Sequence, residues 1–93
     1  MKYVLSYRAV DDFLPIAREH YPAHQAHYQR FAERGDLLLI GPLTEPPNGD
    51  AMAVFVSREA AEEFVAGDPF VVQGAVAQWS VRAWNEVLVP EPS

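Results

Sequence analysis

Two apolar runs constrain the fold more than any other feature of this 93-residue chain. They are "DLLLIGPL" (36–43) and "AMAVFVS" (51–57), and the turn-rich stretch "TEPPNGD" (44–50) separates them. Short apolar runs bounded by Gly, Pro and Asn predict strands, and the Asn48-Gly49 pair favours a hairpin turn. Neither run alternates with polar residues as a strand with one wet face would. Both faces of this hairpin therefore require burial.

A further strand is predicted near each end of the chain. Residues 2–8, "KYVLSYR", are rich in β-branched and aromatic side chains. Residues 76–88, "VAQWSVRAWNEVL", alternate, so that Trp79, Val81 and Ala83 share one face of the strand. The chain thus contains four predicted strands.

One helix is predicted between the first strand and the hairpin, over residues 22–34. Its apolar and aromatic side chains recur at helical spacing, and Gly35 provides a stop. Pro22 suits the first helical turn, where a missing N–H costs nothing. Because Pro15 and Pro22 interrupt any longer helix, the residues before Pro22 are expected to lie outside it, with Asp11-Asp12 offering caps for a separate turn.

A second helix is predicted after the hairpin. Ser57 is a suitable N-cap, and acidic residues follow it near the positive end of the helix dipole. Gly67 marks the far end. Asp68-Pro69 then opens a short turn or helix that extends to about Gly74.

The resulting order, β-α-β-β-α-β, is the ferredoxin-like α+β plan with an antiparallel sheet. Both helices of that plan cover the same face of the sheet. The apolar hairpin 36–57 then leaves its second face bare, and a bare apolar face indicates association. We therefore expect a homodimer that packs sheet face to sheet face, forming a dimeric α+β barrel.

Composition limits the kinds of protein to which this chain can belong. The length fits one domain, assigned to residues 1–89 with a short tail at 90–93. A net charge of −6 argues against nucleic acid and against anionic membrane surfaces as partners. No cysteine is present, which excludes thiol catalysis and thiolate metal sites. No run is long and apolar enough to span a membrane, and a cytoplasmic protein is the expectation.

All three histidines fall in "HYPAHQAHYQRF" (20–31). His20, His24 and His27 have i, i+4, i+7 spacing, which would suit zinc on one helix face. Pro22 argues against this interpretation, because it places His20 before the predicted helix. His24 and His27 alone are i, i+3 and match a zinc pair less well. A single histidine acting as acid or base is the other chemistry open to this segment.

A catalytic histidine needs an acceptor that orients it, commonly a carboxylate. Most carboxylates of this chain fall in loops or exposed turns, whereas Asp68 precedes the apolar stretch "PFVVQGAV". On spacing alone, an Asp before Pro is a helix N-cap. Nucleotide-binding glycine loops and a G-x-S-x-G nucleophile motif do not occur.

Several short stretches, taken together, resemble the YciI-like (YCII-related) domain family. They are Pro22-Ala23-His24, the run from Gly35 through Gly41-Pro42-Leu43, and Asp68-Pro69-Phe70 followed by Gly74. The resemblance implies a ferredoxin-like, usually dimeric fold with no required metal or organic cofactor. It also implies an active-site pair formed by His24 and Asp68.

The resemblance further implies activity of the dehydrochlorinase type on a small molecule. Many relatives carry Arg where this chain has Tyr21, so an anionic substrate group would need another partner, such as Arg8 or Arg82. His20 and His27 match no family motif, which favours a surface position for both. The candidate substrate-binding residues are Tyr7, Arg8, Gly41, Pro42, Phe70 and Arg82.

The leading hypothesis is a small cofactor-independent enzyme of lyase or isomerase type. His24 would be its general base or acid, and Asp68 would orient His24. The alternative is a non-catalytic dimeric module that binds a small ligand or regulates a partner. A metal-dependent variant using the three histidines is a third hypothesis, and the metal-free interpretation is preferred to it.

Overall fold

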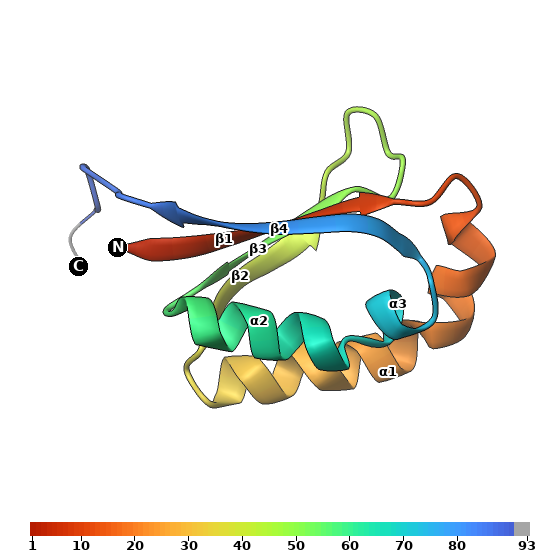
Figure 1. Cartoon of the computed structure of the whole chain (residues 1–93), viewed down its shortest axis with the longest axis horizontal. Coiled ribbons are helices and arrows are strands. Elements are labelled where there is room, and N and C mark those ends of the chain that lie inside the picture. The colour runs from red at the N-terminus through yellow and green to blue at the C-terminus, as the bar shows by residue number, and fades with distance from the viewer. Residues whose placement is uncertain (91–93) are drawn as a thin grey trace.

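A four-stranded antiparallel sheet forms one layer of the protein, and three helices form the other (Figure 1). The computed structural model describes residues 1–90. The elements in chain order are β1 (Lys2–Ala9), α1 (Phe13–Glu33), β2 (Leu37–Pro42), β3 (Ala51–Phe55), α2 (Arg58–Gly67), α3 (Pro69–Val72) and β4 (Val76–Trp84). The strands lie in the order β2-β3-β1-β4. This confirms the ferredoxin-like α+β prediction. Apart from Pro90, the predicted tail 90–93 lies outside the described residues.

The core lies between the sheet and the helices. Leu5 on β1, Phe55 on β3 and Phe64 on α2 are almost completely buried. The rings of Phe55 and Phe64 pack 5.3 Å apart. β1 is an interior strand of the sheet, because it pairs with both β3 and β4. Alternation along β1 points Leu5 and Tyr7 toward the helices and Ser6 and Arg8 away from them.

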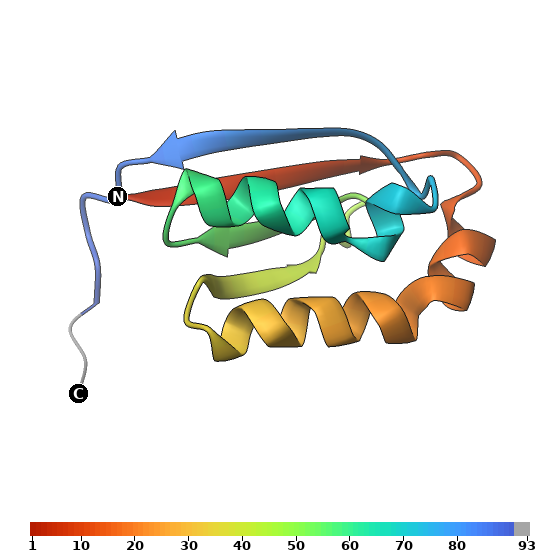
Figure 2. The same cartoon turned by 60° about the horizontal axis from the view of Figure 1, so that its bottom comes forward.

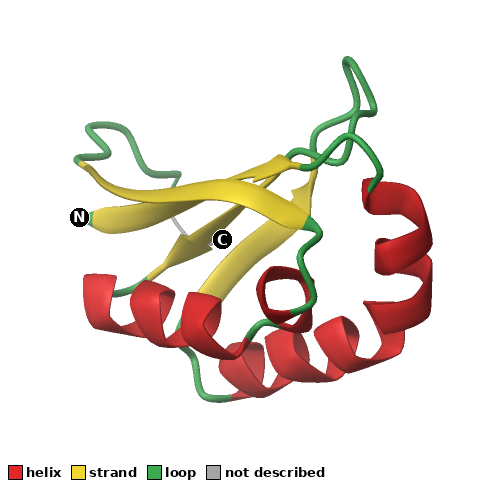
Figure 3. Ribbon diagram, turned by 45° about the vertical axis from the view of Figure 1, so that its right-hand side comes forward, coloured by secondary structure: helices red, strands yellow, loops and turns green. Residues whose placement is uncertain are grey.

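The prediction that Pro22 begins the first helix is wrong. α1 runs unbroken from Phe13 to Glu33, with Pro22 inside it, so His20 is part of the helix. Pro15 falls in the first turn, where its missing N–H has no helical partner in any case. Phe13 and Ala17 on the early turns line a cavity between α1 and the sheet, so the segment that local rules would leave outside the helix belongs to the packed layer of helices. α1 bends along its length, as expected for a helix with an internal proline (Figure 3).

The predicted signals mark the start of α2 and the end of α1, whereas the predicted cap before α1 is absent. The Ser57 hydroxyl accepts a hydrogen bond from the Ala60 N–H at 3.1 Å, capping α2. Gly35 has a φ of +81° and its N–H bonds to the Ala32 carbonyl, ending α1. Asp12 precedes α1 but its side chain makes no cap hydrogen bond.

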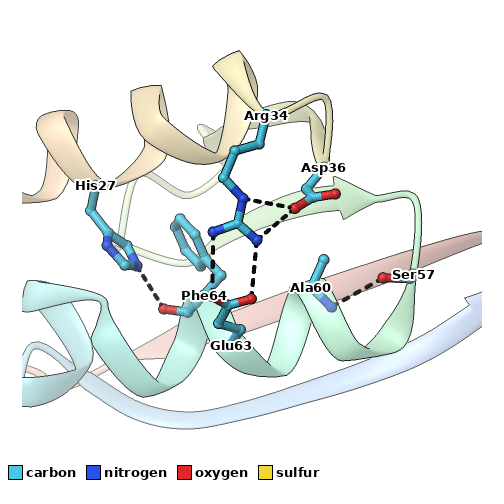
Figure 4. A network of polar contacts seen from close by, with 7 residues as sticks. All are labelled: His27, Arg34, Asp36, Ser57, Ala60, Glu63 and Phe64. Carbon is cyan, nitrogen blue, oxygen red and sulfur yellow. Dashed lines mark hydrogen bonds and ion pairs between the residues drawn. The ribbon is translucent and has the colours of Figure 1, made fainter.

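The predicted surface position of His27 is also wrong. His27 is buried between α1 and α2, and its Nε2 donates to the Phe64 carbonyl at 2.9 Å (Figure 4). Phe64 lies in the last turn of α2, where carbonyls lack helical partners. A side chain on Gly67 would approach the His27 ring to 3.0 Å, so glycine permits this approach. Beside it, Arg34 bonds to both Asp36 and Glu63, a second link between α1 and α2.

The face of the sheet turned away from the helices carries exposed apolar side chains. All three helices lie on one side of the sheet (Figure 2). The register places Leu39, Met52 and Trp84 on the other side, because they pair with Val54, Ser6 and Lys2 respectively. Leu39 is 66% exposed and Trp84 50%. We call this surface the open face.

None of the helices within residues 1–90 combines the length and the apolar character needed to cross a membrane.

Candidate functional site

Asp68 lies at the junction of α2 and α3, and its carboxylate is completely buried. Its Oδ1 accepts hydrogen bonds from His24 Nδ1 at 2.7 Å and from the Phe70 N–H at 3.1 Å. Its Oδ2 accepts one from the Tyr7 hydroxyl at 2.6 Å. Three donors from three different elements therefore satisfy this buried carboxylate.

The N-cap role of Asp68 and its contact with His24 exist together. The bond from Phe70 makes Asp68 the N-cap of α3, and Pro69 occupies the first position of that helix. The same oxygen meets His24 on α1, 44 positions away in sequence. The cap fixes the direction of the carboxylate, and that direction is the one His24 requires.

The ring of His24 is held in one orientation. It stacks on Phe70 with centroids 3.8 Å apart and an interplanar angle of 7°, and it meets Tyr28 in a T-shaped arrangement with centroids 5.3 Å apart. Since the Asp68 carboxylate accepts from Nδ1, that nitrogen carries a proton, and in the neutral ring Nε2 then holds the lone pair. Within residues 1–90, no protein group bonds to Nε2, and this nitrogen is not sealed from solvent. The imidazole of His24 is therefore fixed in orientation by Asp68 and Phe70.

Tyr7 acts as a partner of Asp68. Burial, followed by the negative charge of Asp68 and the hydrogen bond to it, raises the pKa of Tyr7 far above its ordinary value. The hydroxyl stays protonated and continues to donate. Sequence reasoning named Tyr7 as a substrate-binding residue and did not detect this bond, because no spacing rule joins residues on β1 and α3.

An apolar cavity of about 290 Å³ opens beside His24, between the sheet and α1. Its wall is mostly aromatic and aliphatic, with few polar groups. Phe13, Phe64 and Phe70 contribute rings, and the hydroxyl-bearing residues are Tyr7, Tyr21 and Tyr28. A cavity of this size and lining suits a small, flat molecule.

The structure gathers some of the predicted site residues and separates others. His24, Tyr7, Gly41, Pro42 and Phe70 line the cavity, and Asp68 lies directly behind His24.

Arg8 and Arg82 do not reach this cavity. They pair with Gln78 and Val4 respectively, and alternation places both on the open face. The two arginines proposed for an anionic substrate group therefore lie across the sheet from His24.

Tyr21 and Tyr28 line the cavity and were not among the predicted site residues. They flank His24 at three and four positions along α1, the spacing that places side chains on one helix face. The assumption that Pro22 broke the helix hid this relation for Tyr21.

The three histidines have separate partners. His24 meets Asp68, His27 meets Phe64, and His20 lies 3.7 Å from Glu19. Within residues 1–90, no three His, Asp or Glu side chains gather as a metal site would require.

Comparison of the sequence with known proteins identifies the family of this chain. The sequence profile of the YCII-related domain matches residues 1–85. The chain belongs to the YCII-related family. Protein YciI of Escherichia coli O6:H1 is 31% identical over 77 residues, which cover 72% of this chain and 79% of that protein. Protein YciI of Shigella flexneri matches to the same extent.

Solved structures share the fold of this YCII-related chain. One is 5-chloro-2-hydroxyhydroquinone dehydrochlorinase from Burkholderia phenoliruptrix, in complex with 2,5-dihydroxybenzoquinone. It matches with a TM-score of 0.74 and 19% identity, covering 91% of this chain and 94% of its own. Protein Atu4242 of Agrobacterium tumefaciens matches with a TM-score of 0.54 and 12% identity, covering 88% and 89%. At these identities the likeness establishes the fold.

Replacing Tyr7 tests whether its hydroxyl stabilises the buried carboxylate of Asp68. Tyr7→Phe removes one donor from a buried carboxylate, and we expect a loss of about 1.5–3 kcal/mol in the free energy of unfolding, measured by urea denaturation at neutral pH. Folding raises the pKa of Tyr7. The contribution of its hydroxyl to the free energy of unfolding is therefore complete below the ordinary tyrosine pKa of about 10, and it declines as the pH rises above that value.

The difference in the free energy of unfolding between wild type and Tyr7→Phe should therefore shrink at strongly alkaline pH. Tyr3→Phe, which removes a hydroxyl outside the cavity, is the matched control. Equal stability of the Tyr7→Phe and wild-type proteins at neutral pH would contradict the assigned role.

Proposed function

We propose that the protein is a cofactor-independent enzyme of lyase or isomerase type, in which His24 transfers a proton and Asp68 orients it. The observation that carries this proposal is the 2.7 Å contact between His24 Nδ1 and Asp68 Oδ1 at the wall of the cavity. A histidine with its tautomer fixed by a buried carboxylate is a recurrent arrangement for general acid–base catalysis.

The chemistry follows from the free Nε2. This nitrogen takes a proton from a bound molecule, and the Asp68 carboxylate stabilises the imidazolium that forms. On a lyase route, a leaving group then departs with its bonding electrons. On an isomerase route, Nε2 returns the proton to another atom of the same molecule. Neither route needs an oxidant or reductant.

The structural neighbour supports a substrate class. The Burkholderia protein is a dehydrochlorinase of a chlorinated hydroquinone, and its structure holds a flat dihydroxybenzoquinone. The cavity beside His24 is apolar and rich in aromatic rings, which suits ligands of that shape. We therefore propose small cyclic enols, hydroquinones or their halogenated forms as substrates.

We further propose that two copies associate through the open face. Leu39, Met52 and Trp84 expose apolar surface there, and no helix of residues 1–90 covers it (Figure 1). Between them, Val54 is almost completely buried among its strand neighbours. Packing of two such faces would remove this apolar surface from water.

Turnover by His24 variants tests the catalytic proposal. Wild-type protein should convert at least one member of a panel of chlorinated hydroquinones and enol lactones. His24→Ala should lower that rate about 10²–10⁴-fold, the range of a positioned acid or base. His20→Ala is the matched control, because His20 lies on the same helix outside the cavity, and it should keep the wild-type rate.

Wild-type rates in His24→Ala, or equal losses in both variants, would contradict the proposal. Binding of panel members without conversion of any would favour the ligand-binding module instead.

The dimer is tested by sedimentation velocity. Wild type should sediment as a dimer, and Leu39→Lys should shift it to a monomer, because a charge would be buried at the contact. Leu14→Lys changes an exposed leucine on α1, away from the open face, and should leave the dimer intact. A monomeric wild type, or a dimer unaffected by Leu39→Lys, would refute this arrangement.

A further inference from the structure

We propose that Tyr21 and Tyr28 together bind an uncharged hydroxyl or carbonyl oxygen of the substrate, and that the site therefore selects neutral oxygenated rings over carboxylates. This inference rests on the proposed function, since it names the substrate class of the same site. Neither Tyr21 nor Tyr28 was among the site residues predicted from the sequence.

The two tyrosines lie beside the catalytic base. Tyr21, His24 and Tyr28 follow one face of α1, and all three line the cavity. Their ring centroids lie 6.0 Å and 5.3 Å from that of His24. Tyr21 is 46% exposed whereas Tyr28 is half-buried, which places the pair at the mouth of the cavity.

The hydroxyls of the pair face each other across 3.2 Å. One hydroxyl donates to the other, so the pair keeps one free O–H and unused lone pairs. It can therefore donate to a carbonyl oxygen or accept from a hydroxyl group. The hydrogen bond with Tyr28 raises the pKa of Tyr21, so the Tyr21 hydroxyl stays protonated near neutral pH.

Positive charge is absent from the cavity wall. All seven Lys and Arg residues of the chain fall within the described residues, and none of them lines the cavity. Arg8 and Arg82 lie on the open face. Arg34 bonds to Asp36 and Glu63, and Arg58 bonds to the Val81 carbonyl.

An anion in this cavity is disfavoured for two reasons. It would lose hydration in an apolar enclosure that supplies no countercharge while His24 is neutral. It would also meet the negative charge of Asp68, which lies directly behind His24. A neutral ring with two oxygens avoids both costs. One oxygen can meet Nε2 of His24 while another meets the tyrosine pair.

Isothermal titration calorimetry with two probes of similar shape tests the inference. Hydroquinone is neutral, and 4-hydroxybenzoate replaces one hydroxyl with a carboxylate. Wild type should bind hydroquinone, and 4-hydroxybenzoate should bind at least about tenfold more weakly, a difference near 1.4 kcal/mol. Tyr21→Phe and Tyr28→Phe should each weaken hydroquinone binding by roughly 3–10-fold, the effect of one neutral hydrogen bond.

Two further variants sharpen the comparison. Tyr3→Phe removes a hydroxyl from a tyrosine outside the cavity and should leave hydroquinone binding unchanged. Tyr21→Arg places a cation at the mouth and should narrow or reverse the preference against 4-hydroxybenzoate.

The inference is overturned if wild type does not bind hydroquinone, if it binds both probes equally, or if both Tyr→Phe variants bind hydroquinone as wild type does. Calorimetry requires no turnover, so these outcomes bear on the tyrosine pair alone. Full turnover by His24→Ala bears on the proposed function alone.

Discussion

The carboxylate of Asp68 has no exposed surface, and burying a charged group without partners is strongly unfavourable. Its three donors come from β1, α1 and the first turn of α3. Satisfying this one group therefore fixes how the sheet, the long helix and the α2–α3 junction meet. Removing any donor would leave the carboxylate incompletely bonded in the core, which couples the stability of the fold to the geometry of the site.

The same constraint shapes the chemistry open to the protein. Asp68 holds a proton of His24 on Nδ1 and leaves Nε2 without a protein partner within residues 1–90, on a side chain that lines a mainly apolar cavity. In such surroundings, hydrogen bonds and charges act more strongly than in water. His24 and the tyrosine pair are among the few polar side chains of the cavity wall. Membership of the YCII-related family is consistent with a small enzyme built on this plan.

The sequence predicted the order of strands and helices well, because each element has local signals. Ser57 and Gly35 mark helix ends, and the apolar hairpin 36–57 forms the β2–β3 pair. The prediction was wrong at Pro22, which lies inside α1, because local preference is a weak guide where a helix packs against the rest of the fold.

Long-range contacts in the site were harder to predict. Family resemblance, and not spacing, paired His24 with Asp68, and the structure places them in contact. Burial of His27 depends on the position of α2, which periodicity on α1 does not reveal. Arg8 and Arg82 were named for their charge, but strand alternation places both on the face away from His24.

The central claim is that Asp68 fixes His24 as the Nδ1-protonated tautomer with Nε2 free. Nitrogen-15 NMR of the imidazole group of His24, recorded where that ring is neutral, tests it most directly because the two nitrogens are distinguished by their protonation. The account predicts a proton on Nδ1 and none on Nε2. A His24 ring protonated on Nε2, with Nδ1 bare, would contradict it.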